Sequence, residues 1–382
     1  MGLIKKYLKS VLSIITPLFR RILLGFIKIT KKKLPVSEKW LDDKSFKEYQ
    51  GFAKVNENIS YSVSYREVPK INAKHKYVGA QFEPKTKRVY AIPNDASSFM
   101  KITEDNLDFI GDLGDNLFKW TGGCLYNGCL YAFPRTSNSM LCLNLETNNI
   151  SFPFSYNYKT EHHYGGVCTS EGVVYQPPRR SNHILVTNLN TGEIRHINLV
   201  PDFLKMDLRY CGSLIHPNGY IYFFPENGYV IKLDPKNDQW CFIGGYCRSY
   251  AFDAKVGIDG NIYAFSAYGK GLMKVDVISE KVEMLYPERH FGVCGTKVGV
   301  NGRLYVIPGD GEIVYEFDVT NGKLSEIHNC NDSMKAKFAG GVTLKDGQIL
   351  GMPADANRII AINCDKAVTI PDEIYDYFCG FY

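Results

Sequence analysis

The chain has 382 residues, of which 45% are hydrophobic and 13% aromatic, so it can bury a sizeable core as one large repeat domain or two ordinary domains. The formal net charge of +5 is concentrated at the start, where residues 1–33 hold nine Lys and Arg and no acid. The remaining 36 basic and 40 acidic residues give the body a net charge of −4, which excludes a generic polyanion binder.

Residues 1–38 form a basic arm with the spacing of an amphipathic helix. One face collects the apolar side chains that recur every three or four residues, namely Ile4, Leu8, Val11, Ile15, Leu18, Ile22, Phe26 and Ile29. The polar side chains lie largely on the opposite face, and they are Lys6, Lys9, Ser13, Arg20, Lys28 and Lys31. Pro17 is expected to kink this helix or to divide it.

The uncharged stretches of the arm are too short to span a bilayer. Its longest uncharged run has ten residues, from Ser10 to Phe19, whereas a transmembrane helix needs roughly 20. A signal-peptide cleavage site is not evident, and Lys6 stands where a myristoylation motif has Ser or Thr. We therefore expect residues 1–33 to lie on an anionic membrane surface. A helix that docks onto another protein and an organelle-targeting peptide are the alternatives.

Residues 39–70 are predicted to be a linker that ends in an additional strand. The alternation in "NISYSVSYREV", residues 58–68, is typical of a β-strand, and we expect it to pair with the last unit of the following domain and close it.

Seven repeats follow, in residues 71–370. An apolar strand that in most copies ends in Pro recurs with spacings of 41, 44, 47, 41, 42 and 45 residues, centred on Tyr90, Tyr131, Tyr175, Tyr222, Tyr263, Tyr305 and Leu350. Six copies carry Asn-Gly, Asp-Gly or Glu-Gly before this strand, as a two-residue hairpin turn requires. Four short strands per repeat predict an all-β fold, a seven-bladed β-propeller of four-stranded antiparallel blades. Residues 371–382 form an acidic and aromatic tail.

The repeats approximate the form G-G-x-x-x-x-[DN]-G-x-[IL]-Y-x-x-P; in "TGGCLYNGCLYAFP" three residues rather than four separate the glycine pair from Asn127-Gly128. This pattern resembles kelch-like and streptogramin-lyase-like propellers, and it lacks the Gly-His and Trp-Asp pairs of WD40 repeats and the Asp-boxes of sialidases. The resemblance implies the fold and leaves the function open. Resemblance to a streptogramin lyase implies, in addition, a histidine base and a divalent metal on one face of the ring; no cofactor is predicted otherwise.

A basic residue followed by an aromatic one precedes the first strand of the repeats. The predicted ligand-binding residues are Lys76, Tyr77, Lys119, Trp120, His163, Tyr164, Arg209, Tyr210, Arg248 with the offset Tyr250, His290, Phe291, Lys337 and Phe338. In equivalent blades these side chains would form a basic, aromatic ring around one channel mouth, suited to an anionic ligand. The alternative is that the aromatic residue is a wedge between blades and that the basic side chain extends over it.

Loops of the same face carry further candidates. These rim residues are Arg179, Arg180, His183, Asp310, Asp355, Asn357 and Arg358. His163 and His290 occupy equivalent positions in the third and sixth repeats, each two residues after a glutamate, and they are the candidate acid and base if the protein is an enzyme.

Eleven cysteines, none in a C-x-x-C pair, predict buried reduced thiols in a cytoplasmic protein, with no metal site. The sequence thus favours a cytoplasmic, peripheral membrane propeller that binds an anionic small molecule or glycan, or a protein, without catalysis. A lyase or hydrolase acting on an anionic substrate and an interaction scaffold are the alternatives. Nucleic acid is not an expected partner, because the body is acidic and the basic arm is interleaved with apolar residues.

Overall fold

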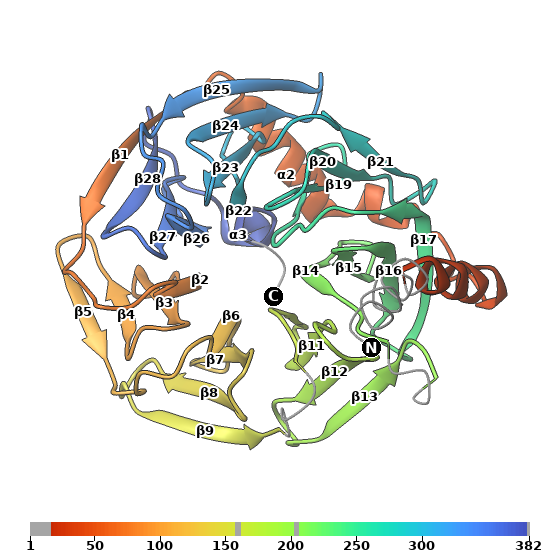
Figure 1. The fold of residues 1–382 in the computed structure, drawn as a ribbon. Helices are drawn as coiled ribbons and strands as arrows, with labels where there is room; N and C mark the ends of the chain where they lie inside the picture. The colour runs from red at the N-terminus through yellow and green to blue at the C-terminus, as the bar shows by residue number, and fades with distance from the viewer. Residues whose placement is uncertain (1–16, 157–161, 202–205, 380–382) are drawn as a thin grey trace, which may run out of the picture.

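A computed structural model describes residues 17–156, 162–201 and 206–379. Seven four-stranded antiparallel sheets are arranged as blades around a central channel (Figure 1). Within each blade, the strands follow one another in space from the channel to the rim. The predicted seven-bladed propeller is therefore confirmed.

The first four blades follow the chain order. Blade 1 contains β2 to β5, at Tyr77–Glu83, Arg88–Pro93, Phe99–Ile102 and Leu107–Ile110. Blade 2 contains β6 to β9, at Trp120–Tyr126, Cys129–Pro134, Ser139–Asn144 and Ile150–Ser155. Blade 3 contains β10 to β13, at Val167–Cys168, Val173–Gln176, His183–Asn188 and Ile194–Asn198. Blade 4 contains β14 to β17, at Tyr210–Ile215, Ile221–Pro225, Gly228–Asp234 and Gln239–Cys247.

The remaining blades complete the ring. Blade 5 contains β18 to β21, at Lys255–Val256, Ile262–Phe265, Leu272–Val275 and Val282–Leu285. Blade 6 contains β22 to β25, at Val293–Val298, Leu304–Pro308, Ile313–Asp318 and Lys323–Asn329. Blade 7 contains β26 to β28, at Phe338–Thr343, Ile349–Pro353 and Arg358–Cys364, and takes its outermost strand, β1 at Tyr61–Glu67, from the N-terminal side.

The strand β1 closes the ring, as predicted. It runs antiparallel to β28, from the pair Tyr61 and Cys364 to the pair Glu67 and Arg358. The Tyr61 hydroxyl accepts the Val300 N–H at 2.9 Å and donates to the Gly347 carbonyl at 3.2 Å, so it also ties blade 6 to blade 7. Pairing the first strand with the last blade leaves the ring without an open seam.

The glycines of the repeat place a bulge in the innermost strands. Gly79, Gly122 and Gly340 have φ values of 88°, 68° and 67°, and the register of each strand shifts at or beside them. A Cβ on Gly340 would lie 2.7 Å from the Gly79 Cα, so neighbouring blades approach backbone to backbone here. Because these positions carry no side chains, the innermost strands of neighbouring blades can pack this closely.

The channel has two mouths. The first mouth carries the segments that precede the innermost strands and the loops that follow the second strands. The second mouth carries the hairpin turns between the first and second strands, and helices cover part of it. These helices are η1 (Lys39–Asp42), α2 (Lys44–Val55), η3 (Asp372–Ile374) and α3 (Tyr375–Cys379).

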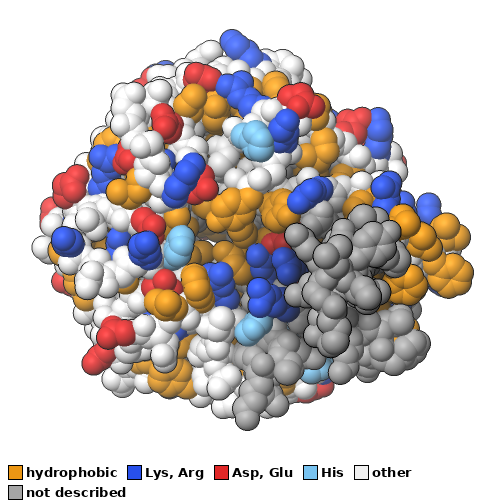
Figure 2. Space-filling model, viewed as in Figure 1, with side chains coloured by type: hydrophobic (Ala, Val, Ile, Leu, Met, Phe, Trp, Pro, Cys, Tyr) orange, Lys and Arg blue, Asp and Glu red, His pale blue; other side chains and the backbone are white. Residues whose placement is uncertain are grey.

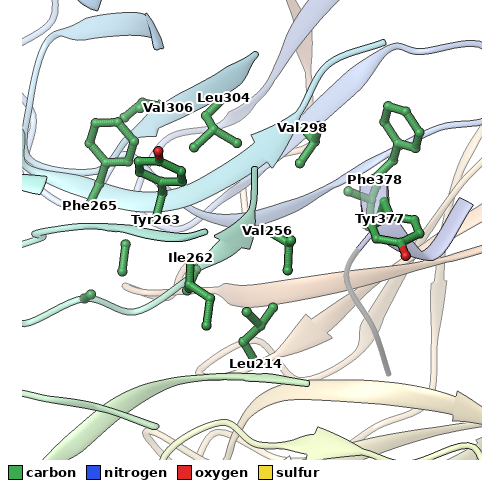
Figure 3. Close-up of a cluster of buried hydrophobic side chains, with 14 of the residues drawn as sticks. Leu214, Val256, Ile262, Tyr263, Phe265, Val298, Leu304, Val306, Tyr377 and Phe378 are labelled. Atoms are coloured by element: carbon green, nitrogen blue, oxygen red, sulfur yellow. The ribbon is translucent and has the colours of Figure 1, made fainter. Parts of the chain in front are cut away.

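The two helical segments at the second mouth pack on one another. The Tyr49 ring of α2 stacks on the Tyr377 ring of α3 at 4.5 Å, and Phe378 meets Tyr49 edge to face. Figure 3 shows Tyr377 and Phe378 in the same buried cluster as Val256 and Val298 of blades 5 and 6. The predicted linker therefore contains a helix that the sequence analysis missed, and the tail is part of the core.

Residues 17–30 form a helix beside the outer strand of blade 4, drawn in red in Figure 1. Leu18, Ile22, Phe26 and Ile29 are exposed together on one side, as the predicted apolar face requires. The earlier members of that face and residues 1–16 lie outside the described residues. Within the described part of the chain, no helix is long and apolar enough to cross a bilayer.

Candidate functional site

A cavity of about 1180 Å³ occupies the channel. Backbone of the bulged glycines lines its wall, and at the first mouth it is bordered by five side chains, which we call the mouth cluster: Phe118, Arg135, Tyr164, Arg179 and Phe252. Figure 2, which faces the first mouth, shows hydrophobic and basic side chains gathered around a central hollow. The cavity is large enough for a small-molecule ligand.

Arg135 lies against two aromatic rings. Its guanidinium carbon is 4.3 Å from the centre of the Phe118 ring and 5.0 Å from that of Tyr164. The Tyr164 ring in turn packs at 5.3 Å on Phe252. Burial raises the pKa of Tyr164 to about 12, so its hydroxyl stays protonated at neutral pH. The cluster thus combines a cation with aromatic faces.

The two arginines of the cluster differ in their partners. Arg179 forms an ion pair with Glu226 and donates to the Cys211 sulfur at 3.1 Å. Arg135 makes one long hydrogen bond, 3.4 Å to Asn94 Oδ1, and no carboxylate of the described residues lies within ion-pair distance of it. The guanidinium of Arg135 therefore lies at the edge of the cavity without a direct ion pair to a described residue, although it is close enough to Asp95 to oppose the effect of burial, which raises the pKa of that carboxyl.

Farther along the cavity wall, two lysines share one carboxylate. Asp253 lies 2.7 Å from Lys297 Nζ and 3.3 Å from Lys255 Nζ. Burial lowers the pKa of Lys297 to about 8, and the two ammonium groups lower the pKa of Asp253 to about 2 although its own burial opposes this. This group adds a net positive charge to the cavity when both lysines are protonated.

The structure corrects the predicted ring of lysines. Lys76, Lys119 and Lys337 are at most 3% exposed, and their ammonium groups donate to backbone carbonyls rather than to the channel. Lys119 Nζ, for example, bonds the Asn116 and Gly114 oxygens at 2.8 and 3.1 Å. Burial lowers the pKa of all three amines. A ligand at the mouth does not reach them.

Five of the seven predicted aromatic partners are buried, as a position between blades would require, whereas Tyr164 borders the cavity and Tyr250 lies in the groove beside His290. Tyr77, Trp120, Tyr210, Phe291 and Phe338 are buried, and among them only Phe338 borders the cavity. The Trp120 Nε1–H donates to the Ser139 carbonyl and the Tyr210 hydroxyl to the Tyr229 carbonyl, so both polar ends are satisfied within the protein.

Two of the predicted rim acids join neighbouring blades. Asp355 accepts the His75 N–H, and Asp310 accepts the Ala336 N–H. Both donor residues belong to the next blade and directly precede a buried lysine. Asp95 does the same for Phe118. His75, Phe118 and Ala336 all have positive φ, between 45° and 57°, which turns the following lysine into the layer between blades.

The other rim residues are dispersed. Arg179 belongs to the mouth cluster, whereas Arg180 is exposed. His183 is buried and stacks on His196 at 3.9 Å. Arg358 pairs with Asp332 and covers the Tyr65 ring near the outer strands, and the neighbouring Asn357 carbonyl accepts the Val68 N–H.

The predicted acid–base pair is not brought together. His163 is 2% exposed, its Nδ1 lies 3.1 Å from the Pro177 carbonyl, and burial lowers its pKa to about 3. His290 is exposed and borders a shallow groove of about 620 Å³ beside Arg248 and Tyr250. The two histidines therefore do not face one reacting group. Of the arginines in the predicted ring, Arg248 covers Tyr250 in this groove and Arg209 pairs with Asp207 at 2.8 Å.

The described side chains do not fit the divalent metal that the lyase resemblance implies. Among them, no group of three or more His, Cys, Asp or Glu converges on one point. The acids nearest the first mouth are engaged otherwise, since Glu226 pairs with Arg179 while Asp95 and Asp355 accept backbone N–H groups. We derive no chemistry through a metal.

Several mouth residues were missed by the sequence analysis. Arg135 follows Pro134 in blade 2 as Arg179 follows Pro178 in blade 3, so comparison of these two loops could have found it. Phe118 and Phe252 do not belong to the repeated pattern, and no sequence pattern indicates that Asp253 pairs with Lys297.

No protein-family model matches the sequence, and no curated protein is significantly similar to it. Solved structures are similar in fold. A streptogramin B lyase has a TM-score of 0.65 at 10% identity, over 80% of this chain and 98% of its own. A catalytically inactive virginiamycin B lyase from Staphylococcus aureus with quinupristin has the same TM-score at 11% identity, over 80% and 99%.

The extracellular domain of a putative hybrid two-component system from B. thetaiotaomicron is also similar. Its TM-score is 0.60 at 12% identity, over 79% of this chain and 40% of that chain. The chain is thus a seven-bladed propeller structurally similar to streptogramin B lyase. At these identities the likeness establishes the fold alone.

Proposed function

We propose that the propeller binds a small anionic ligand with a planar apolar part in the central cavity. The observation that carries this proposal is Arg135, whose guanidinium rests on Phe118 and Tyr164 at the first mouth and has no carboxylate partner among the described residues. The anion would pair with Arg135, and the planar part would lie against Tyr164 and Phe252.

The surroundings of Arg135 favour an anion over a neutral ligand. Protein surrounds the sides of the cavity, so a charge-assisted hydrogen bond there is less screened than in bulk water. Lys255 and Lys297 share the single carboxylate of Asp253 and leave positive charge on the wall. A second acidic group of the ligand would be accommodated there. The ligand would enter at the first mouth, beside Arg135, and α3 covers part of the second mouth.

Phenyl phosphate is the minimal probe for this proposal, with phenol as its uncharged counterpart. We expect saturation-transfer NMR to show that phenyl phosphate binds the full chain and phenol binds more weakly. An Arg135→Met substitution should weaken phenyl phosphate roughly tenfold or more, since a hydrogen bond to a charged group contributes about 1.5–3 kcal/mol.

Arg289→Met is the matched control. Arg289 also covers a tyrosine, at 4.8 Å from the Tyr315 ring centre, but it lies outside the cavity and pairs with Glu326. Its substitution should leave phenyl phosphate affinity unchanged. Equal affinities of the wild type and the Arg135→Met variant would contradict the proposed site.

We further propose that the protein acts at an anionic membrane surface that it reaches through residues 1–33. Nine basic residues without an acid in this segment support the proposal, and eleven free cysteines support the cytoplasmic side of that membrane. Co-sedimentation of the full chain with phosphatidylglycerol vesicles tests it. A chain that stays in the supernatant at every vesicle concentration would contradict it.

A further inference from the structure

The helix of residues 17–30 contacts blade 4 through a mixed face that carries Leu24 and Ile27 as well as basic side chains. Leu24 is fully buried there and packs in the same cluster as Tyr210 and Phe242. The Arg20 guanidinium donates to the Asp207 carbonyl, and Lys28 Nζ donates to the Gly244 carbonyl. The helix is therefore fixed to the ring at both of its ends.

The basic side chains of this face cover aromatic rings of blade 4. Lys28 Nζ is 5.0 Å from the Tyr229 ring centre, and Lys31 Nζ is 4.2 Å from the Trp240 ring centre. Burial lowers the pKa of both amines. Lys28 is half-buried against the protein and Lys31, although exposed, rests on the Trp240 ring, so both amines already have contacts within the protein.

The opposite face of the helix is an apolar stripe, made of Leu18, Phe19, Ile22, Phe26 and Ile29. Its five side chains are between 55% and 84% exposed. A half-turn of the helix about its axis would lay this stripe on the aromatic surface of blade 4 and release the cations to water. The observed orientation is the reverse, which leaves a contiguous apolar surface on the outside.

We propose that the apolar stripe inserts into the surface of a lipid bilayer while the basic face stays on blade 4. This inference rests on the proposed membrane association and specifies which atoms make it. The contact would then be mainly hydrophobic and made by the apolar face of the predicted amphipathic helix, with Lys28 and Lys31 held on blade 4.

The charges beside the apolar stripe favour lipid as its binding partner. Lys32 and Lys33 are exposed at the end of the stripe, in a segment of nine basic residues and no acid, and they suit anionic headgroups beside an apolar insertion. The apolar spacing of the stripe continues in the sequence back to Ile4, beyond the described residues.

Hydrophobic insertion and electrostatic adsorption respond differently to salt. At about 0.5 M NaCl, exposed charges are screened over a few ångströms, while apolar burial is not weakened. Binding of the full chain to phosphatidylglycerol and phosphatidylcholine vesicles should therefore persist at this salt concentration.

The test replaces two residues of the stripe in the full chain, Ile22→Ser with Phe26→Ser. We expect vesicle partitioning to fall at least tenfold. The control variant carries Val55→Ser with Phe109→Ser, two exposed apolar residues on α2 and β5 that lie outside the stripe, and it should bind as the wild type does. All four side chains are exposed, so the melting temperatures of both variants should match that of the wild type.

Each outcome separates this inference from the broader proposal. Wild type that does not sediment with any vesicle would remove membrane association itself. If the wild type and the stripe variant sediment equally well, only the inserted stripe is overturned. The same holds if the wild type dissociates from the vesicles at about 0.5 M NaCl. A wild-type dimer that the stripe variant loses, without vesicle binding, would assign the stripe to a second copy and overturn the inference as well.

Discussion

At the scale of single residues, the lysines at equivalent positions of three blades, Lys76, Lys119 and Lys337, donate to backbone carbonyls, and we expect them to stabilise the fold. Lys119 is 3% exposed and satisfies two carbonyls of its own loop. A Lys119→Met substitution should lower the free energy of unfolding by about 1–3 kcal/mol, because buried acceptors lose their donor.

Urea unfolding measures this loss, and the exposed Lys366→Met is its control. Phenyl phosphate affinity should be unchanged in both variants. Weaker binding by a stably folded Lys119→Met variant would return this lysine to the ligand site.

A buried histidine makes stability depend on pH. His216 Nδ1 accepts the Asn218 N–H, so Nε2 carries the proton and donates to the Gly260 carbonyl at 3.0 Å. Burial lowers its pKa to about 4 from 6.5. The unfolded chain binds the proton more readily, so this contribution is complete above pH 6.5 and is lost as the pH falls towards 4.

We expect the wild type to lose ~2 kcal/mol more than a His216→Gln variant when the pH is lowered from about 7 to about 5. Glutamine keeps one donor and one acceptor but does not titrate. His163, with a pKa lowered to about 3, contributes in the same direction in both proteins and cancels in the comparison. Parallel pH profiles of the two proteins would show that His216 is not the titrating group.

At the scale of elements, the bulged inner strands hold the blades together. Gly340 and Gly322 both have positive φ, 67° and 70°, but a Cβ on Gly340 would meet Gly79 at 2.7 Å whereas one on Gly322 meets nothing within 4 Å. Both alanine substitutions carry the same backbone strain, about 1 kcal/mol. Gly340→Ala alone adds a steric clash between blades 7 and 1.

Thermal unfolding should therefore show a clearly larger loss of stability for Gly340→Ala than for Gly322→Ala. Equal losses would mean that the contact between inner strands adjusts without cost and that the bulges do not set the blade spacing.

At the scale of the whole molecule, the sequence predicts the ring better than it predicts the site. The hairpin turns and apolar strands recur every 41–47 residues, and the alternation of residues 58–68 is enough to identify β1. These features are local, so they are visible in the chain. The helix α2 was missed because it is stabilised by packing on Tyr377 and Phe378, which lie over 300 residues away.

The side-chain directions at the mouth could not be predicted in the same way. Whether Lys119 faces the channel or the layer between blades depends on the positive φ of Phe118 and on the Asp95 carboxylate of the previous blade. Neither is apparent from residue types. Arg135 was overlooked because only two of the blades carry an arginine after the proline of the second strand, Arg135 and Arg179, and the search favoured positions repeated in all seven.

The most direct test of the central claim is a crystal structure of the full chain with phenyl phosphate bound. The account predicts the phosphate within hydrogen-bond distance of the Arg135 guanidinium and the phenyl ring against Tyr164 or Phe252. Phosphate bound at Lys76, Lys119 or Lys337, or a central cavity without the probe in a crystal that binds it elsewhere, would contradict the account.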